Sequence, residues 1–344
     1  MAFRKSSDLR PQILEVSPEA AIPGGEFQVR GKNFTREGRT AVTIGATPAP
    51  LVIGSSSYLI VRVPEGAAGG EMIVGQNGDA SAPRALQVGV QIADGLHPIA
   101  NPAVDRYGTI YATFSGSRGQ KTPVSVFRVD AATGQSAPYV SDILNASGLA
   151  VGQDDALYVS SRNEGSIYRV PEGGGTTSVY VEGMGVATGI VFDPQGNLYV
   201  GDRSGTIFKV SPQRQIYVFA TLETSISAYH LAFGPDGYLY VTGPTTSSFD
   251  AVQRVSPAGE VEPFFRGLGR PQGLAFDAQA NLYVAASFEG RRGVVRISQD
   301  RQAGLFLSGP GIVGLAFAPD QHLILATSSA LFRVHVGIDG QRLP

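Results

Sequence analysis

The chain has 344 residues, of which 42% are hydrophobic and 16% are charged, with a formal net charge of −2 and no cysteine. This charge gives no electrostatic reason to expect a nucleic acid or an anionic membrane as a partner, and the lack of cysteine excludes disulfides, thiolate nucleophiles and cysteine metal sites. The length favours two domains, and 44 glycines and 22 prolines with so few charges favour an all-β protein.

Residues 1–10 contain the basic pair Arg4 and Lys5, but no apolar run follows it. They therefore predict a tail rather than a secretory signal or a membrane anchor. No later stretch reaches the roughly 18 apolar residues that a spanning helix needs. We expect a cytoplasmic protein, with a periplasmic or secreted location as the alternative if a leader has been removed.

Residues 11–88 contain short apolar runs separated by Gly and Pro turns, which is typical of a β-sandwich. Three features resemble the IPT/TIG family of immunoglobulin-like domains: the Ser17-Pro18 opening, the Gly24-Gly25 turn and the Gly31-Lys32-Asn33-Phe34 stretch. Domains of that family are mostly structural or adhesive modules. The resemblance implies an immunoglobulin-like sandwich and brings no catalytic residues.

From residue 96 onward one pattern recurs: Gly-Leu-Ala-Phe, a turn, and then Leu-Tyr-Val. The six copies begin at Asn101, Gly148, Gly189, His230, Gly273 and Gly314, the first and last being degenerate. The tyrosine position follows ten residues after each start, at 111, 158, 199, 240, 283 and 324 (an isoleucine in the last copy), so the spacings are 47, 41, 41, 43 and 41. Self-similarity at this period is typical of a β-propeller.

Each copy continues with a third apolar run that ends in a basic residue, and most copies have a fourth run. Four strands every ~41 residues form one propeller blade, which predicts a six-bladed propeller over residues 89–344. The last copy has only three strands before the chain ends. We expect residues 89–94 to supply its fourth strand and close the ring.

The inner strand of a blade starts near the central channel, where the adjoining loops commonly bind ligands. The candidate ligand-binding residues at these starts are Asn101, Ser147, Thr188, Tyr229, His230 and Gln272. The Gly-Leu-Ala-Phe-Asp and Leu-Tyr-Val motifs resemble the SMP-30/gluconolactonase and NHL-like superfamily. Its lactonases hold a divalent metal on the axis with carboxylates and amides at the position before the leading glycine, and the related streptogramin lyases place their reactive His there.

In this chain the residues at that position are Ala100, Ser147, Thr188, Tyr229, Gln272 and Val313, with no Asp, Glu, Asn or His. A hard cation prefers several oxygen ligands that include carboxylates. We therefore expect no metal and no cofactor. Arg162 and the Asp202-Arg203 pair, which follow second strands, are interpreted as parts of solvated loops. The basic residues that end the third strands are interpreted as long stems packed between blades.

Two functions remain open. The first is a binding or scaffolding protein that presents the channel face, with the immunoglobulin-like domain as a further candidate surface, to a small molecule, a carbohydrate or a protein. The second is a gluconolactonase-like hydrolase or lyase with a metal-free site, in which His230, Tyr229 and Thr188 are the catalytic candidates. His230 is either a general base or a polar residue that fills the channel. A closed propeller has no free sheet edge, so we expect a monomer.

Overall fold

The computed structural model describes residues 10–35, 39–67, 69–247 and 250–341. These residues form strands and turns, and among them there is no helix that could cross a membrane. The chain divides into two compact units, residues 1–90 with 305–310 and residues 91–304 with 311–344. The all-β prediction is confirmed.

The first unit contains two sheets that enclose one core. One sheet has the strand order β1 (Gln12–Ser17), β3 (Glu26–Lys32), β7 (Tyr58–Arg62) and β6 (Leu51–Gly54). The other has the order β2 (Ala20–Ala21), β10 (Arg84–Val88), β8 (Gly70–Gln76), β4 (Thr40–Ile44) and β5 (Thr47–Ala49), with β9 (Asp79–Ala80) beside β8. Two packed sheets are the immunoglobulin-like sandwich that the sequence predicts.

Alternation along the strands builds the core of this sandwich. Phe27 and Val29 on β3, Leu59 on β7 and Val74 on β8 are all fully buried. Successive strand residues point to opposite faces, so polar neighbours alternate with these apolar side chains. Gly31 is needed because a Cβ there would lie 2.0 Å from the carbonyl oxygen of Gln12.

The second unit contains six sets of four antiparallel strands within its described residues. Blades 1 to 3 are β12 (Ala103–Val104), β13 (Ile110–Thr113), β14 (Val126–Val129), β15 (Ser136–Val140); β16 (Ala146–Val151), β17 (Leu157–Ser161), β18 (Ser166–Val170), β19 (Ser178–Val181); and β20 (Ala187–Phe192), β21 (Leu198–Asp202), β22 (Thr206–Val210), β23 (Ile216–Thr221). Blades 4 to 6 are β24 (His230–Phe233), β25 (Leu239–Thr242), β26 (Asp250–Val255), β27 (Val261–Leu268); β28 (Leu274–Phe276), β29 (Leu282–Phe288), β30 (Arg291–Ile297) and the start of β31 (Ala303–Ser308); and β32 (Ile312–Phe317), β33 (His322–Thr327), β34 (Leu331–His335), β11 (Val90–Ala93).

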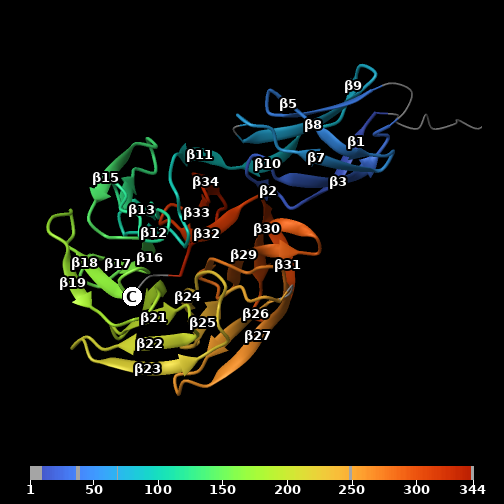
Figure 1. The fold of residues 1–344 in the computed structure, drawn as a ribbon. Helices are drawn as coiled ribbons and strands as arrows, with labels where there is room; N and C mark the ends of the chain where they lie inside the picture. The colour runs from blue at the N-terminus through green and yellow to red at the C-terminus, as the bar shows by residue number, and fades with distance from the viewer. Residues whose placement is uncertain (1–9, 36–38, 68, 248–249, 342–344) are drawn as a thin grey trace, which may run out of the picture. The chain divides into compact units, whose positions relative to one another are not determined.

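The inner strands of successive blades contact one another in order, and β12 of blade 1 also contacts β32 of blade 6. The blades therefore form a closed ring, a β-propeller (Figure 1). In blade 6 the outer strand is β11, which pairs with β34. A strand that precedes blade 1 in sequence thus completes the last blade, as residues 89–94 were predicted to do.

In blades 2 to 5 the repeated tyrosine of the second strand joins the blade to the next one. Tyr158 meets Phe192 of the next inner strand edge-on, and Tyr240 meets Phe276 in the same way, each pair with ring centroids 4.8 Å apart and planes inclined at 75°. The Tyr240 hydroxyl donates to Asp236 Oδ2 in the turn before its strand, at 2.8 Å. Burial, with the hydrogen bond and charge of Asp236, raises the pKa of Tyr240 to about 12, so the hydroxyl keeps its proton. Edge-on aromatic pairs stabilise a fold by more than the burial of their apolar area alone, which explains why the motif repeats.

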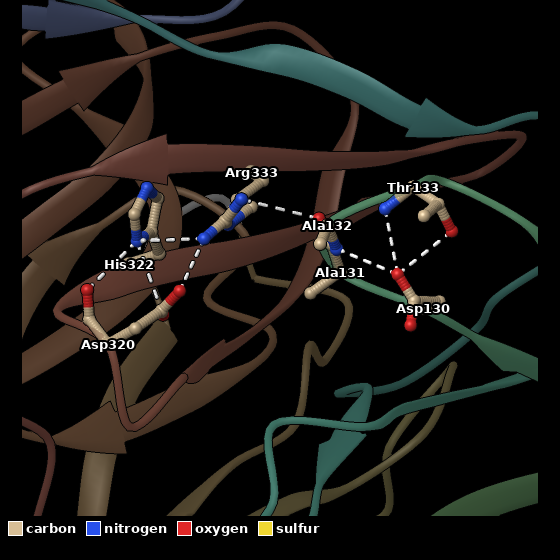
Figure 2. A network of polar contacts seen from close by, with 7 residues as sticks. All are labelled: Asp130, Ala131, Ala132, Thr133, Asp320, His322 and Arg333. Carbon is tan, nitrogen blue, oxygen red and sulfur yellow. Dashed lines mark hydrogen bonds and ion pairs between the residues drawn. The ribbon is translucent and has the colours of Figure 1, made fainter.

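The seam between blades 6 and 1 carries a polar network (Figure 2). Arg333 on β34 forms an ion pair with Asp320 of its own blade and donates to the carbonyl oxygen of Ala131 in blade 1, at 3.3 Å. Burial raises the pKa of Asp320, but the hydrogen bond from Arg333 and the charges of His322 and Arg333 together lower it below its usual value. The carboxylate therefore stays charged and holds the guanidinium at the seam.

Candidate functional site

The inner strands lie around the propeller axis and approach one another most closely where they start. A Cβ on Gly148 would lie 2.3 Å from the carbonyl oxygen of Thr188, and one on Gly189 would lie 2.4 Å from that of Tyr229. Gly189 N also donates to the same Tyr229 oxygen at 2.9 Å. The backbones of neighbouring inner strands are therefore in contact where the strands start. Only glycine permits such a close approach at these positions.

Asn101 takes the leading position in blade 1 and joins two other blades. Its Nδ2 donates to the carbonyl oxygen of Leu274 at 3.0 Å, and its Oδ1 accepts from Leu315 N at 3.1 Å. A Cβ on Gly273 would lie 2.1 Å from Asn101 Oδ1, so the glycine leaves room for this side chain. The Asn101 carboxamide therefore uses its NH2 group and its oxygen to hold the inner strands of blades 5 and 6 together.

Thr188 and Tyr229 are buried and engaged in hydrogen bonds. The Thr188 hydroxyl donates to the carbonyl oxygen of Gly201 at 2.8 Å and accepts from Tyr229 N at 3.1 Å. The Tyr229 hydroxyl donates to the carbonyl oxygen of Glu223. Burial, followed by the charges of Glu223 and Asp202, raises the pKa of Tyr229 to about 12. Both side chains connect blades 3 and 4.

The other three candidates, His230, Ser147 and Gln272, make no such side-chain hydrogen bonds within the described residues or are less buried. His230 is buried, and neither ring nitrogen has a hydrogen-bond partner among the described residues. Burial alone lowers its pKa to about 4, so the ring is neutral at pH 7. The Ser147 hydroxyl is also buried without a partner in the described part of the chain, whereas Gln272 is half-buried.

A cavity of about 200 Å³ lies further along the axis, toward the ends of the inner strands. It is lined in every repeat by a small residue, two places after the leading residue: Ala103, Ala150, Val191, Ala232, Ala275 and Ala316. Because side chains alternate, this position points to the same side as the leading residue two places earlier. Among the described residues that line the cavity, only Asn101 and Gln341 carry polar side chains.

The mouth of the cavity is polar and is crossed by the C-terminal segment. Ala278 N donates to the carbonyl oxygen of Asp339 and Gln341 N to that of Phe276, both at 2.9 Å. Arg106 and Asp155, from blades 1 and 2, form an ion pair of 2.5 Å beside it. The site is therefore an apolar pocket with a charged rim.

The structure places the sequence candidates in two groups. Asn101 lines the cavity, while Ser147, Thr188, Tyr229, His230 and Gln272 lie at the start of the inner strands and do not. Within the described residues there is no group of three or more His, Cys, Asp or Glu side chains that could hold a metal ion.

The basic residues of the third strands lie outside this cavity, and three of them pair with carboxylates. Arg169 bonds Asp154 at 2.7 Å, Arg254 bonds Glu262 at 2.5 Å, and Arg333 bonds Asp320. In blade 3, Lys209 lies over the Tyr199 ring, 5.5 Å from its centroid. For these four residues the charges are used within the blades and at their seams.

Sequence reasoning located the channel but not its cavity. The signal was present, because a small residue recurs two places after each leading residue, five times alanine and once valine. Because side chains alternate along a strand, the leading residue and the residue two places later both face the axis. Glycine at the first position lets the strands touch, and a small apolar residue at the second predicts an apolar space beside that contact. The segment that crosses the mouth has no comparable signal, since it lies outside the repeat.

Comparison with known proteins supports both parts of the fold. Residues 11–88 match the IPT/TIG domain family, which confirms the resemblance drawn from the motifs. No curated protein shows significant similarity to the chain.

Three solved structures are similar to the chain at low identity. A protein classed as a gluconolactonase is 18% identical with a TM-score of 0.62, covering 74% of this chain and 94% of its own. An auxiliary nutrient binding protein from Bacteroides ovatus is 13% identical with a TM-score of 0.55, covering 99% and 100%. A streptogramin B lyase is 12% identical with a TM-score of 0.51, covering 94% and 96%. At these identities the similarity shows the propeller fold.

Proposed function

We propose that this protein binds a small, largely apolar molecule in the axial cavity and does not transform it. The proposal rests on the lining of the cavity. It consists of Leu, Ala, Val, Ile, Phe and Pro side chains from all six blades, with two polar side chains among them. A concave apolar pocket with a few polar groups is the usual form of a small-molecule site.

The size of the cavity supports an organic ligand rather than solvent. One water needs roughly 10–15 Å³ of such space and two to four polar partners. The cavity offers about 200 Å³, and Asn101 already uses its carboxamide in hydrogen bonds to Leu274 and Leu315. An apolar body fits this lining, and the charged rim at Arg106 and Asp155 suits a polar end of the ligand.

The propeller is further proposed to belong to the six-bladed SMP-30/gluconolactonase and NHL-like superfamily. The repeated motifs and the fold neighbours support this assignment. In this reading the IPT/TIG sandwich is a non-catalytic interaction module attached to a binding propeller.

The test uses N-phenyl-1-naphthylamine, a neutral dye whose fluorescence rises in apolar surroundings. We expect saturable binding to the full chain. Ala275→Leu would fill the cavity from its wall, since Ala275 is a half-buried lining residue. This variant should abolish dye binding while the protein stays folded, because the added side chain enters empty apolar space.

Ala137→Leu is the matched control, because Ala137 is exposed on β15 and does not line the cavity. It should bind the dye as the wild type does. Equal dye binding by the Ala275→Leu variant and the control, or no saturable binding by the wild type, would overturn the proposal.

The hydrolase or lyase alternative depends on Thr188, Tyr229 and His230. The first two use their hydroxyls in hydrogen bonds to backbone atoms, and none of the three lines the cavity. A panel of lactones and esters tests this alternative directly. Turnover that His230→Ala abolishes would replace the binding proposal with a catalytic one.

A further inference from the structure

Three arginines gather at the end of the propeller opposite the cavity mouth. Arg162 directly follows β17 and Arg203 directly follows β21. The last residues of these strands pair with the first residues of their inner strands, Ser161 with Ala146 and Asp202 with Ala187. Both arginines therefore lie where the inner strands start, in adjacent blades.

The third arginine comes from an enlarged loop in blade 1. Residues 114–125 connect β13 to β14, whereas residues 162–165 and 203–205 make the same connection in blades 2 and 3. The longer loop accounts for the spacing of 47 between the first two repeats. Arg118 lies within it and is exposed.

Asn145, a buried residue of blade 2, holds this loop in place. Its Nδ2 donates to the carbonyl oxygens of Gly116 and Ser117, both at 2.9 Å, and its Oδ1 accepts from Gly119 N at 2.7 Å. These three bonds bracket Arg118, so the loop that carries it is fixed against blade 2.

Arg162 lies between the other two cations and is half-buried, in contrast to the solvated loop that the sequence suggested. Its Nη2 donates to the Gly116 carbonyl oxygen at 3.1 Å, while its Nε is buried without a partner among the described residues. Burial and then the positive charges of Arg203 and Arg118 lower its pKa. Like charges held together in this way repel one another unless an anion lies between them.

No carboxylate in the described part of the chain pairs with any of the three. Arg203 instead donates its Nε to the carbonyl oxygen of Ser225 at 3.2 Å. Two more buried donors in this region, the hydroxyls of Ser115 and Ser147, lack hydrogen-bond partners among the residues that the structure describes. Buried polar groups are normally satisfied, so an unpaired set of donors is a feature of a binding site.

We infer that this end of the propeller binds the oxyanion group of a small ligand, a carboxylate, sulfate or phosphate, between Arg118, Arg162 and Arg203. The planar guanidinium offers paired donors that match an oxyanion in geometry as well as charge. The site is separate from the axial cavity, and its ligand chemistry is opposite to that of the apolar pocket.

The experiment titrates the full chain with inorganic phosphate, sulfate and citrate at constant ionic strength, with chloride as the balancing ion. Calorimetry should show saturable binding of at least one of them, and the anion that binds most tightly identifies the chemical group. Arg118→Gln and Arg203→Gln each remove one charge-assisted contact and should weaken binding by about tenfold or more. Both residues are exposed, so neither substitution should unfold the protein.

Arg292→Gln is the matched control, because Arg292 is an exposed arginine in blade 5. It should bind the anion with wild-type affinity. Without anion at low ionic strength, the Arg118→Gln variant should melt no lower than the wild type, since the substitution relieves repulsion from Arg162; a purely structural role of Arg118 would lower the melting temperature.

The inference is overturned if none of the three anions binds saturably, or if the Arg118 and Arg203 variants lose no more affinity than Arg292→Gln. All four proteins should bind N-phenyl-1-naphthylamine equally, so a failure at this end is distinguishable from a failure of the axial cavity.

Discussion

His230 should make the propeller sensitive to acid, and replacing it with leucine should remove that sensitivity. The imidazole is buried, has no hydrogen-bond partner among the described residues, and has a pKa of about 4 instead of 6.5. The unfolded chain therefore takes up a proton below pH 6.5, whereas the folded chain takes it up only below pH 4. Lowering the pH through this window favours unfolding.

The size of the effect follows from the two pKa values. Each pKa unit corresponds to 1.36 kcal/mol, so the full penalty below pH 4 is about 3 kcal/mol. Between pH 7.5 and 4.5 the free energy of unfolding should fall by about 2–3 kcal/mol because of this residue alone. His230→Leu should lack this component, and at pH 7.5 it should be no less stable than the wild type, since leucine leaves no buried nitrogen unpaired.

Urea denaturation at the two pH values measures the difference. The chain has no tryptophan, and of its 13 tyrosines only Tyr58 precedes residue 91, so tyrosine fluorescence follows the propeller. His335→Leu, at an exposed position on β34, is the matched control and should keep the wild-type pH dependence. Parallel losses of stability in the wild type and the His230 variant would refute the reasoning.

Three further predictions concern stability. Tyr283→Phe removes the hydroxyl that donates to Asp277 Oδ2 at 3.0 Å in a buried site and should cost about 1–3 kcal/mol in urea denaturation, with an unchanged midpoint as the contrary result. Gly189→Ala places a Cβ 2.4 Å from the carbonyl oxygen of the next inner strand and should lower the melting temperature by several degrees, whereas Gly304→Ala, with open space around it, should not. Arg333→Leu breaks the seam ion pair of Figure 2 and should cost about 1 kcal/mol or less at pH 7; this loss should shrink as the pH falls through the lowered pKa of its carboxylate partner, and a pH-independent loss would contradict the ion-pair explanation.

The sequence predicts the propeller well because each blade repeats the same local chemistry. In blades 2 to 5 a turn aspartate is followed four or six residues later by a tyrosine, and an aromatic residue lies on the next inner strand. In each of these blades the tyrosine hydroxyl bonds the aspartate and the tyrosine ring contacts the aromatic ring. The strand of residues 90–93 was predictable for a different reason, since a blade with three strands leaves an edge unpaired.

The candidate site is less predictable because it depends on exceptions to the repeat. Arg118 lies in the connection of residues 114–125, which is longer than the same connection in blades 2 and 3, and Asn145 reaches it from a blade that follows it in sequence. Spacing reveals the extra residues but not which side chain holds them. The half-buried state of Arg162 likewise results from contacts with Gly116, 46 residues away, which no local pattern encodes.

The two ends of the inner strands explain why one chain has two kinds of site. At their starts the strands touch through glycine. Of the polar side chains there, Thr188 bonds to backbone atoms, and Ser147 is buried without a partner in the described part of the chain. Two residues further on, the strands lie further apart, and their small apolar side chains, mostly alanine, line a cavity on the axis. A ligand at the first end meets arginines and unpaired donors, and a ligand at the second meets hydrocarbon. Variants that separate the two binding activities therefore test the geometry of the inner strand itself: Ala275→Leu should affect only the dye, and Arg118→Gln only the anion.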